Sequence, residues 1–258
     1  MKTMKTYLQM AALLVAAAVV AACSKSQEKT VYILTATLSP QGELPTRSVM
    51  TDTGSGITTT WEVGDYIWVN YESVGDPNSE ARGIVTAVDG EGKATVSVEL
   101  VDPKDEGNIL FGFPYKHWKE GNGLQEEVQR GTLEDINANF SDIGGAGTLS
   151  VSGASVTIPE GVTLWADNCI WKLTFTDGTD DITKKINRLV ISFGEYDNYI
   201  IEPRYPYLDE IYVSLYPQYD AAVTISARTY PDTYSASKAS ITLVEGNFYT
   251  SHIALTKD

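Results

Sequence analysis

Short runs of residues in which apolar side chains occupy every second position constrain the fold of this chain more than any other feature. Residues 30–38, 94–101 and 169–176 each follow this pattern. Because successive side chains of a strand point to opposite faces, each run predicts a strand with one buried face. No long stretch repeats apolar residues at helical spacing, and the chain is rich in the branched and aromatic residues that suit strands. We therefore predict an all-β protein.

The same pattern, interrupted by Gly, Pro, Asn and Asp, places the other strands. Strands are predicted at residues 30–38, 58–61, 66–69, 82–88, 94–101, 108–114, 151–158, 169–176, 186–193, 207–216, 221–228, 239–243 and 248–256. Short strands at such regular spacing are typical of a β-sandwich. The length suits one large or two small domains, and we predict two. The predicted organisation is a leader at 1–22, a tether at 23–29, an N-terminal domain at 30–166 and a C-terminal domain at 167–258.

Three segments have the composition of connections. Residues 39–56 are rich in Pro, Gly, Ser, Thr and Asp and predict an exposed connection without regular structure. Residues 64–65, Gly and Asp, predict the turn of a hairpin whose second strand enters the core. Residues 117–147 predict a polar loop with one helical turn near 124–130, and the glycine-rich residues 143–147 are predicted to be flexible.

The chain begins with a leader that ends on a cysteine. Lys2 and Lys5 form a basic region, residues 10–20 form an apolar region, and small residues directly precede Cys23. A lipoprotein signal requires a thiol at the first mature position to carry diacylglycerol, and Cys23 supplies it. The apolar run is too short to cross a bilayer as a helix. We therefore expect acyl chains on Cys23 to anchor the mature chain to a membrane surface, at about 0.8 kcal/mol per buried methylene.

The mature chain is strongly acidic. Loss of Lys2 and Lys5 with the leader lowers the formal charge from −15 to −17. Such a charge repels phosphate backbones, so we expect no nucleic-acid partner. With Cys23 used for lipid, Cys169 is the only thiol left and has no partner for an intrachain disulfide. Its place in an alternating run predicts a small buried side chain.

The sequence offers little support for an enzyme. His117 and His252 are the only histidines, and neither lies in a nucleophile or metal motif. We predict no catalytic residue, no cofactor and no metal site. A calcium ion held by loop carboxylates stays open as an alternative. The two candidate clusters are Asp177, Asp180 and Asp181, and Asp102, Asp105, Glu106 and Asn108.

Four segments have a more specific pattern when they are taken in order behind the leader. They are Arg47-Ser48 followed by TWEVGDYI at residues 60–67, the turn Phe113-Pro114-Tyr115, the strand WKLTF at 171–175, and the ending GNFYT at 246–250 with LTK at 255–257. Each segment alone is weak. Together they resemble the fimbrillin family, the lipoprotein precursors of type V pilus subunits, and the resemblance runs over most of the mature chain.

This resemblance implies two tandem β-sandwich domains of transthyretin-like topology. Polymerising members of the family are cut by a trypsin-like, arginine-specific protease in the loop after the first strand, which here implies a cut between Arg47 and Ser48 and a removed pro-segment at 30–47. The removed strand would present Tyr32, Leu34, Ala36 and Leu38. A strand from a neighbouring subunit then fills the groove by β-augmentation. The residues implied for that donor strand are Phe248, Tyr249, Thr250, Ile253 and Leu255.

Two functions are therefore expected. The first is a structural and adhesive subunit of a pilus, an outer-membrane lipoprotein at the cell surface whose partners are other pilus subunits, the protease and a host or bacterial surface ligand. The alternative is a monomeric surface lipoprotein of the same fold. It would keep its first strand and bind a glycan or host protein through tyrosine-rich loops. The residues for that role are Tyr196, Tyr199, Tyr205, Tyr207, Tyr212, Tyr216 and Tyr219.

Overall fold

The structure is a computed structural model that describes residues 29–40, 49–54, 57–121, 123–125, 127–194, 197–204 and 207–258. The leader, Cys23, Arg47 and Ser48 lie outside these residues, and what the sequence predicts for them stays a prediction. Residues Tyr32–Asp258 form one compact unit. Strands dominate it, which confirms the all-β prediction. Within the described ranges, no helix has both the length and the apolar character that crossing a bilayer requires.

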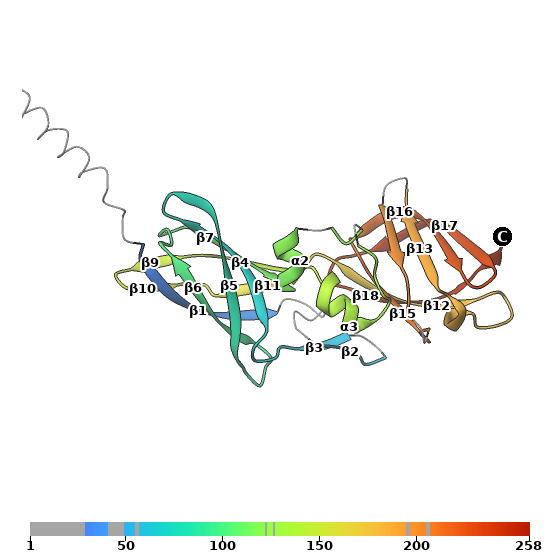
Figure 1. The fold of residues 1–258 in the computed structure, drawn as a ribbon, viewed down its shortest axis with the longest axis horizontal. Helices are drawn as coiled ribbons and strands as arrows, with labels where there is room; N and C mark the ends of the chain where they lie inside the picture. Colours follow the sequence, from blue (N-terminus) through green and yellow to red (C-terminus); the bar gives the residue numbers. More distant parts are fainter. Residues whose placement is uncertain are drawn as a thin grey trace, which may run out of the picture. The chain divides into compact units, whose positions relative to one another are not determined.

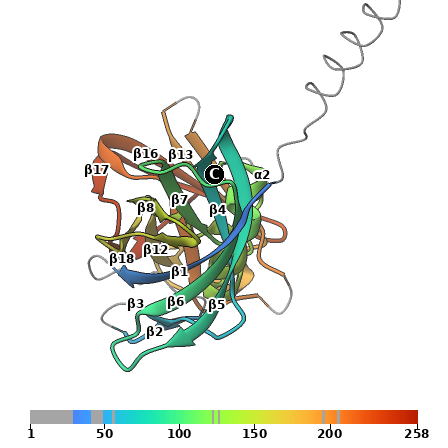
Figure 2. The same ribbon diagram turned by 90° about the vertical axis from the view of Figure 1, so that its left-hand side faces the viewer.

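Seven strands from the first part of the chain close into a barrel in the order β1-β11-β8-β7-β4-β5-β6. Their bounds are β1 Val31–Pro40, β4 Tyr66–Ser73, β5 Asp76–Val88, β6 Ala94–Val101, β7 Asn108–Phe113, β8 Ile143–Thr148 and β11 Val162–Ala166. The pairs β4–β5, β5–β6, β4–β7, β7–β8 and β8–β11 are antiparallel, whereas β1 runs parallel to β11. The first strand therefore lies between β11 and β6 (Figures 1 and 2).

A short helix covers part of the outside of this barrel. The helix α2, Tyr115–Glu120, follows β7 directly. Its Trp118 stacks on Trp68 of β4 with ring centroids 5.6 Å apart. Gly112 of β7 lies under the same indole, where an added Cβ would come within 2.2 Å of the ring. A side chain at this position would push the helix off the sheet, so glycine is required here by close packing.

The predicted hairpin at residues 64–65 is wrong in its pairing. The turn exists, since the Asp65 amide donates to the Glu62 carbonyl. However, β4 pairs with β5 and β7, and the strand before the turn, β3 (Ile57–Thr60), pairs instead with β2 (Val49–Asp52). The prediction that residues 39–56 lack regular structure is wrong at 39–40, which end β1, and at 49–52, which form β2, and residues 41–48 and 55–56 lie outside the described residues. Local turn residues do not identify the partner of a strand, because partners are chosen by long-range packing.

The prediction of a flexible segment at residues 143–147 is also wrong. These residues form most of β8, which pairs with β7 on one side and β11 on the other. Gly145 is buried against β11, where an added Cβ would come within 2.5 Å of Leu164. The glycines thus allow close packing inside a sheet. The loop predicted at 117–147 further contains α2, the helical turn α3 (Leu133–Asp135) and the π-helical segment η1 (Ile136–Phe140).

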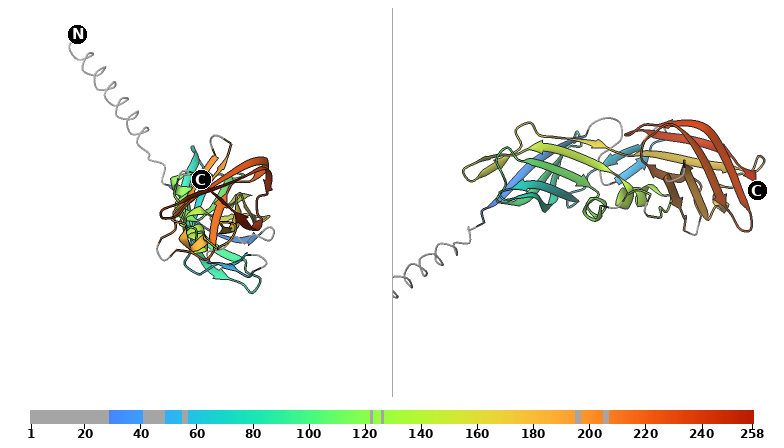
Figure 3. Two further views of the ribbon diagram at one scale, coloured as in Figure 1. Left: turned by 90° about the vertical axis from the view of Figure 1, so that its right-hand side faces the viewer. Right: turned by 90° about the horizontal axis from the view of Figure 1, so that it is seen from above.

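The second part of the chain forms two sheets that share one core. Their strands are β12 Cys169–Thr176, β13 Arg188–Phe193, β14 Asp197–Ile201, β15 Ile211–Leu215, β16 Gln218–Arg228, β17 Thr233–Leu243, β18 Phe248–Ala254 and β19 Thr256–Lys257. The order in the first sheet is β15-β12-β18, and in the second it is β14-β13-β16-β17-β19. The strands coloured orange to red in Figure 3 gather in this group. A small hairpin, β9 Ser150–Ser152 with β10 Ser155–Thr157, and the 3-10 helix η2, Thr183–Lys185, complete the described elements.

Two hydrophobic cores result, one inside the barrel and one between the two later sheets. The second core also receives side chains from before residue 167. They are Ile57, Leu124, Ile136 and Phe140. Segments of the first part of the chain thus pack against the second core. The domain division at residue 167 and the transthyretin-like topology stay predictions.

Candidate functional site

The first strand contributes a row of side chains to the barrel core. Leu34 and Leu38 are fully buried and Ala36 is 5% exposed. Tyr32 is half-buried, packs against the same core and donates its hydroxyl to the Gly153 carbonyl at 3.3 Å. The four residues that the sequence analysis placed on one face therefore do lie on one inward face. The described main-chain register with β11 starts late in the strand, at Leu38 opposite Val162.

The segment that follows β1 leads to a hairpin that belongs to the other core. Residues 41–48, with Arg47 and Ser48, lie outside the described residues. The β2–β3 hairpin comes next, and its Met50 and Ile57 pack in the second core. The strand before Arg47 and the hairpin after it are thus held by different cores.

An ionic cluster fastens the hairpin to the second core. Lys172 of β12 lies 2.8 Å from the Asp52 carboxylate and 2.6 Å from the Glu210 carboxylate. The Tyr212 hydroxyl lies 2.7 Å from Asp52 and 2.9 Å from Glu210, and donates its single proton to either of them. Asp52 also accepts the Gly54 amide at 2.6 Å. We call Asp52, Lys172, Glu210 and Tyr212 the clasp.

In the clasp, hydrogen bonds and opposite charges favour the ionised forms of Asp52 and Lys172 more than burial disfavours them. Burial raises the pKa of Asp52, but hydrogen bonds from Lys172 and Tyr212 outweigh it, so the pKa of Asp52 falls below its ordinary value of 3.8. Hydrogen bonds to Asp52 and Glu210 raise the pKa of Lys172 above 10.5. Burial and the same two carboxylates raise the pKa of Tyr212, which stays protonated as a donor. The side chains of Asp52 and Lys172 are each 14% exposed, which limits screening by solvent.

These pKa shifts predict a pH dependence. A lowered pKa at Asp52 contributes stability that is fully present above pH 3.8 and is lost as the pH falls through the folded-state value. The raised pKa at Lys172 contributes stability that is present below pH 10.5 and is lost above it. We expect Asp52→Asn to lower the free energy of unfolding by a constant amount between about pH 5 and 9. The difference from wild type should shrink below pH 3.8.

Denaturant unfolding at a series of pH values measures this difference. Asp209→Asn is the matched control, because Asp209 pairs with Lys184 in an exposed ion pair and is itself 76% exposed. We expect the control to change the unfolding free energy little at any pH. A penalty for Asp52→Asn that is the same at pH 2.5 as at pH 7 would contradict the role given to the clasp.

The strand implied as a donor is seated in its own sheet. β18 runs parallel to β12 from Phe248 opposite Ile170 to Ala254 opposite Thr176. Phe248, Tyr249 and Ile253 are half-buried, Thr250 is exposed, and Leu255, just beyond the strand, is 3% exposed. β18 is nevertheless an edge strand, since β12 is its only partner in the described sheet. Its release would break this parallel ladder and would also displace β19, which follows in the chain and pairs with β17 at Tyr234 and Ser235.

The two edges of the second core are closed differently. At the β14–β15 edge, the Gln129 side chain donates to the Ser214 carbonyl at 2.7 Å and accepts from the Ser214 amide at 2.9 Å. Its backbone pairs with Ile200 and Glu202 beside β14. Gln129 thus bridges the two sheets with four hydrogen bonds. At the other edge, β17 and β18 are not hydrogen-bonded neighbours in the described sheets.

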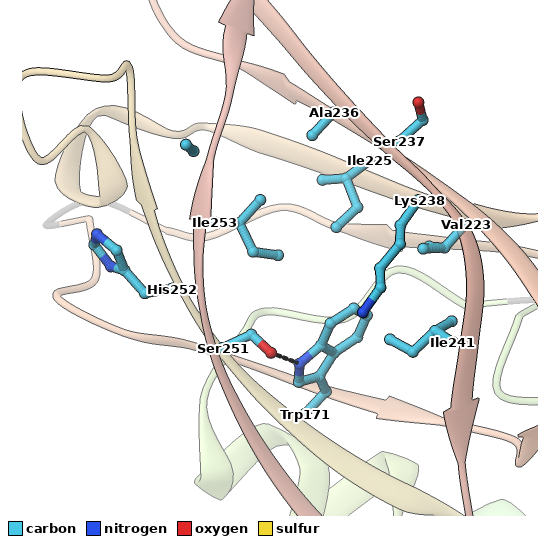
Figure 4. A pocket seen from close by; sticks show the side chains of 11 residues that line it. Trp171, Val223, Ile225, Ala236, Ser237, Lys238, Ile241, Ser251, His252 and Ile253 are labelled. Atoms are coloured by element: carbon cyan, nitrogen blue, oxygen red, sulfur yellow. Dashed lines mark hydrogen bonds between the residues drawn. The ribbon is translucent and has the colours of Figure 1, made fainter.

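A groove of about 370 Å³ lies between β17 and β18. Val223 and Ile225 of β16 line it, and Trp171 and Ile253 form its wall (Figure 4). The Trp171 indole donates to the Ser251 hydroxyl at 2.9 Å, so its polar atom is satisfied and its ring faces the groove. Figure 4 also shows His252 on the opposite side of β18 from Ser251 and Ile253, as the alternation of a strand requires.

Each of the two histidines lies beside a polar side chain of a neighbouring segment. His252 shares a hydrogen bond with Thr174 at 2.8 Å on the outer face of β18. His117 is in α2, with its ring nitrogen 3.7 Å from the Asp142 carboxylate. Cys169 is fully buried, and burial raises the pKa of its thiol to about 12, which leaves it protonated and unreactive at neutral pH.

The tyrosine-rich segment is mostly occupied with packing. Tyr199 is fully buried, and its hydroxyl accepts hydrogen bonds from the Tyr216 amide and the Gln125 side chain. Tyr212 belongs to the clasp. Tyr219 is 60% exposed, and Tyr230, which the sequence analysis did not select, is 94% exposed. Tyr196 and Tyr205 lie outside the described residues.

Several of the carboxylates considered for calcium accept hydrogen bonds from backbone amides. Asp177 accepts the amides of Thr179 and Asp180, Asp181 accepts the amide of Thr183, and Asp105 accepts the amide of Val151. Across the described residues, no group of three His, Cys, Asp or Glu side chains is arranged to hold a metal ion.

Comparisons with known proteins give similarity at the level of structure only. No family model matches the chain, and no curated protein matches its sequence. The similar solved structures include fimbrial proteins and putative cell adhesion proteins. A fimbrial assembly protein from Parabacteroides distasonis is 11% identical with a TM-score of 0.44, over 89% of this chain and 93% of that one. A fimbrial protein from Bacteroides ovatus is 13% identical with a TM-score of 0.42, over 84% and 48%. The tip fimbrial protein Mfa3 from Porphyromonas gingivalis is 9% identical with a TM-score of 0.40, over 87% and 95%.

Sequence reasoning missed the clasp, Gln129 and Lys238. Asp52 and Lys172 are separated by 120 positions, and no spacing rule connects them. A weak signal existed for Lys172, because it is a cation between aromatic residues of a strand with a buried face. Lys238 lies opposite Val223 on the inner face of its sheet, which only the strand register shows.

Proposed function

We propose that this protein is a subunit of a cell-surface pilus, exported as a lipoprotein through Cys23 and assembled by strand exchange after cleavage between Arg47 and Ser48. The observation that carries the proposal is the separation across the Arg47 segment. β1 fills the barrel core, whereas the hairpin after Arg47 is held by the clasp on the second core. A cut at Arg47 would therefore free β1 alone and leave the new N-terminus anchored.

The proposal includes two tandem domains of transthyretin-like topology and a donor strand from a neighbouring subunit. Removal of β1 opens the barrel between β11 and β6, and an incoming strand with alternating apolar residues would restore the ring by β-augmentation. The candidate donor is the β18 segment with Phe248, Tyr249, Thr250, Ile253 and Leu255. Its position at a sheet edge supports release.

The test is the N-terminus of the protein taken from its native cell surface. Intact mass and N-terminal sequencing are expected to find Ser48 in wild type and an acylated Cys23 in Arg47→Ala. The variant should remain an uncut monomer on size-exclusion chromatography and form no fibres. Arg82→Ala is the control, since Arg82 lies in strand β5 outside the connecting segment, stacked on Tyr66. Normal polymers of Arg47→Ala would overturn the proposal.

A second candidate keeps residues 24–47 and acts as a monomeric surface lipoprotein that binds a glycan or protein. The exposed rings of Tyr219 and Tyr230 favour it, because exposed aromatic side chains suit such contacts. The same experiment separates the two candidates. An acylated Cys23 start in the wild-type surface protein would support the second.

A further inference from the structure

The two sheets around the second core do not match in size. The sheet β15-β12-β18 has three strands and faces a sheet of five. Gln129 closes the β14–β15 edge, whereas at the β17–β18 edge the only described bridge is β19, which continues the chain from β18 and pairs with β17 at Tyr234 and Ser235. The middle of β17, from Ala236 to Ile241, is therefore left without a covering strand. Residues 237–240 of β17 are exposed one after another, as expected for a strand uncovered on both faces.

Both rims of the groove are strand edges with main-chain groups free to pair. β18 pairs with β12 only, and β17 pairs beyond β16 only with β19, at Tyr234 and Ser235. The groove lies between the edges of β17 and β18. Its volume of about 370 Å³ lies in the range of peptide and ligand sites. An added strand could take hydrogen bonds from the β18 edge and cover Val223 and Ile225 with its side chains.

One charge lies on the inner face of this groove. Lys238 is opposite Val223 in the register, and Figure 4 shows its ammonium group reaching toward Trp171. Seven other described lysines lie beside carboxylates, namely Lys93, Lys104, Lys116, Lys119, Lys172, Lys184 and Lys257. No carboxylate lines the groove, although the chain carries 34 acidic residues. The described lining of this apolar groove therefore provides no counter-charge for Lys238.

An inward charge on an edge strand normally prevents association. Lys238 would repel any strand that brings only apolar residues or a second cation. The strands at the groove of a second copy are of this kind, since β17, β18 and β19 contain no acidic residue. The same ammonium favours a strand that brings a carboxylate to it. The groove therefore selects against pairing with the same groove of a second copy and for an acidic partner strand, which is specificity by repulsion as well as attraction.

We propose that the groove between β17 and β18 accepts one extended strand of a different protein chain, with apolar side chains at alternate positions and a carboxylate that pairs with Lys238. The strand would add to the free edge of β18 and make the three-stranded sheet one strand wider. This goes beyond the proposed function, because the groove lies in the second core and requires neither cleavage at Arg47 nor release of β1. The groove exists while β18 is paired with β12, before any release of β18 as a donor strand.

The test uses a displayed library of nonapeptides in which threonine alternates with Val, Ile, Phe, Glu, Gln or Lys. It is selected on the chain from residue 24 to 258 carrying Arg47→Ala, so that pilus assembly does not interfere. We expect enriched peptides to carry one Glu among apolar residues. Replacing that Glu by Gln should weaken binding about fivefold. On a Lys238→Glu background the preference should change from Glu to Lys, whereas Lys184→Glu, an exposed lysine outside the groove, should select the same peptides as its parent.

Three results would overturn the proposal. One is enrichment without any acidic preference. Another is equal binding to Ile253→Gln, which makes the groove wall polar at a half-buried position, with folding verified by thermal unfolding. If that variant does not fold, Ile253→Val takes its place, and enriched peptides should still bind it more weakly. The third is a selection that enriches no peptide. In that case palmitate is tested as a second probe, and Lys238-dependent binding of palmitate alone would identify the groove as a small-molecule pocket.

Discussion

Deletion of residues 30–40 is expected to abolish cooperative unfolding of the barrel at room temperature. Leu34 and Leu38 are fully buried and Ala36 nearly so. A fully buried leucine contributes about 1.5–3 kcal/mol by transfer from water, and the cavity left behind adds to that loss. The deletion also opens the ring between β11 and β6, which exposes two strand edges. The summed cost approaches the whole stability of a typical domain, about 5–15 kcal/mol.

Amide hydrogen exchange measures this result strand by strand. β4, β7 and β8 should lose protection in the deletion variant, whereas β12 and β13 of the second core should keep it. A synthetic peptide of residues 30–40, added in excess, should restore protection by mass action. The matched control is Thr35→Ala with Thr37→Ala, because both threonines are exposed on the outer face of the same strand. Unchanged protection in the barrel after the deletion would show that β1 is not needed for its stability.

Replacement of Gln129 by leucine is expected to lower the free energy of unfolding by about 2–6 kcal/mol. The Gln129 side chain imitates a neighbouring strand, since it satisfies both the amide and the carbonyl of Ser214. Leucine has a similar volume but leaves these two buried backbone groups without partners, at about 1–3 kcal/mol each. Gln129 is fully buried, so water cannot easily replace the lost hydrogen bonds.

Denaturant unfolding with a probe of the second core measures this loss. Gln125→Leu is the control from the same segment. Gln125 is only half-buried and donates to the side chains of Asp197 and Tyr199 at 3.2 and 3.1 Å, where solvent can substitute. We expect it to cost less than half as much. Equal effects of the two substitutions would mean that the bridge between β14 and β15 has no special importance.

The strands were predictable to the extent that their patterns were local. The rows Leu34, Ala36 and Leu38 in β1 and Trp171, Leu173 and Phe175 in β12 are buried as their alternation indicated. Alternation works because Cβ atoms point to opposite faces of a strand, whatever lies opposite. The glycine-rich strand β8 escaped the same reasoning. Its composition is typical of a loop, and only its contact with β11 shows why large side chains are excluded there.

Pairing and closure were not predictable by these rules. The turn at residues 64–65 was identified, but β3 pairs with β2 and not across that turn. The barrel closes through β1 and β11, whose paired residues are separated by more than 100 positions. Neither choice follows from any local pattern, because the free energy of a strand pair depends on the side chains that both strands bury together.

The sequence by itself determined the strand character of the chain, the buried faces of β1 and β12, and the expectation of a lipidated leader. These depend on residue type and on spacing along the chain, which physical chemistry translates directly into orientation. The contact of Asp52 with Lys172, the closure of one edge of the second core by Gln129 and the open groove beside Lys238 at the other edge depend on the tertiary fold. Each of these requires residues far apart in sequence to share one low-solvent environment, and the chain must fold before that environment exists.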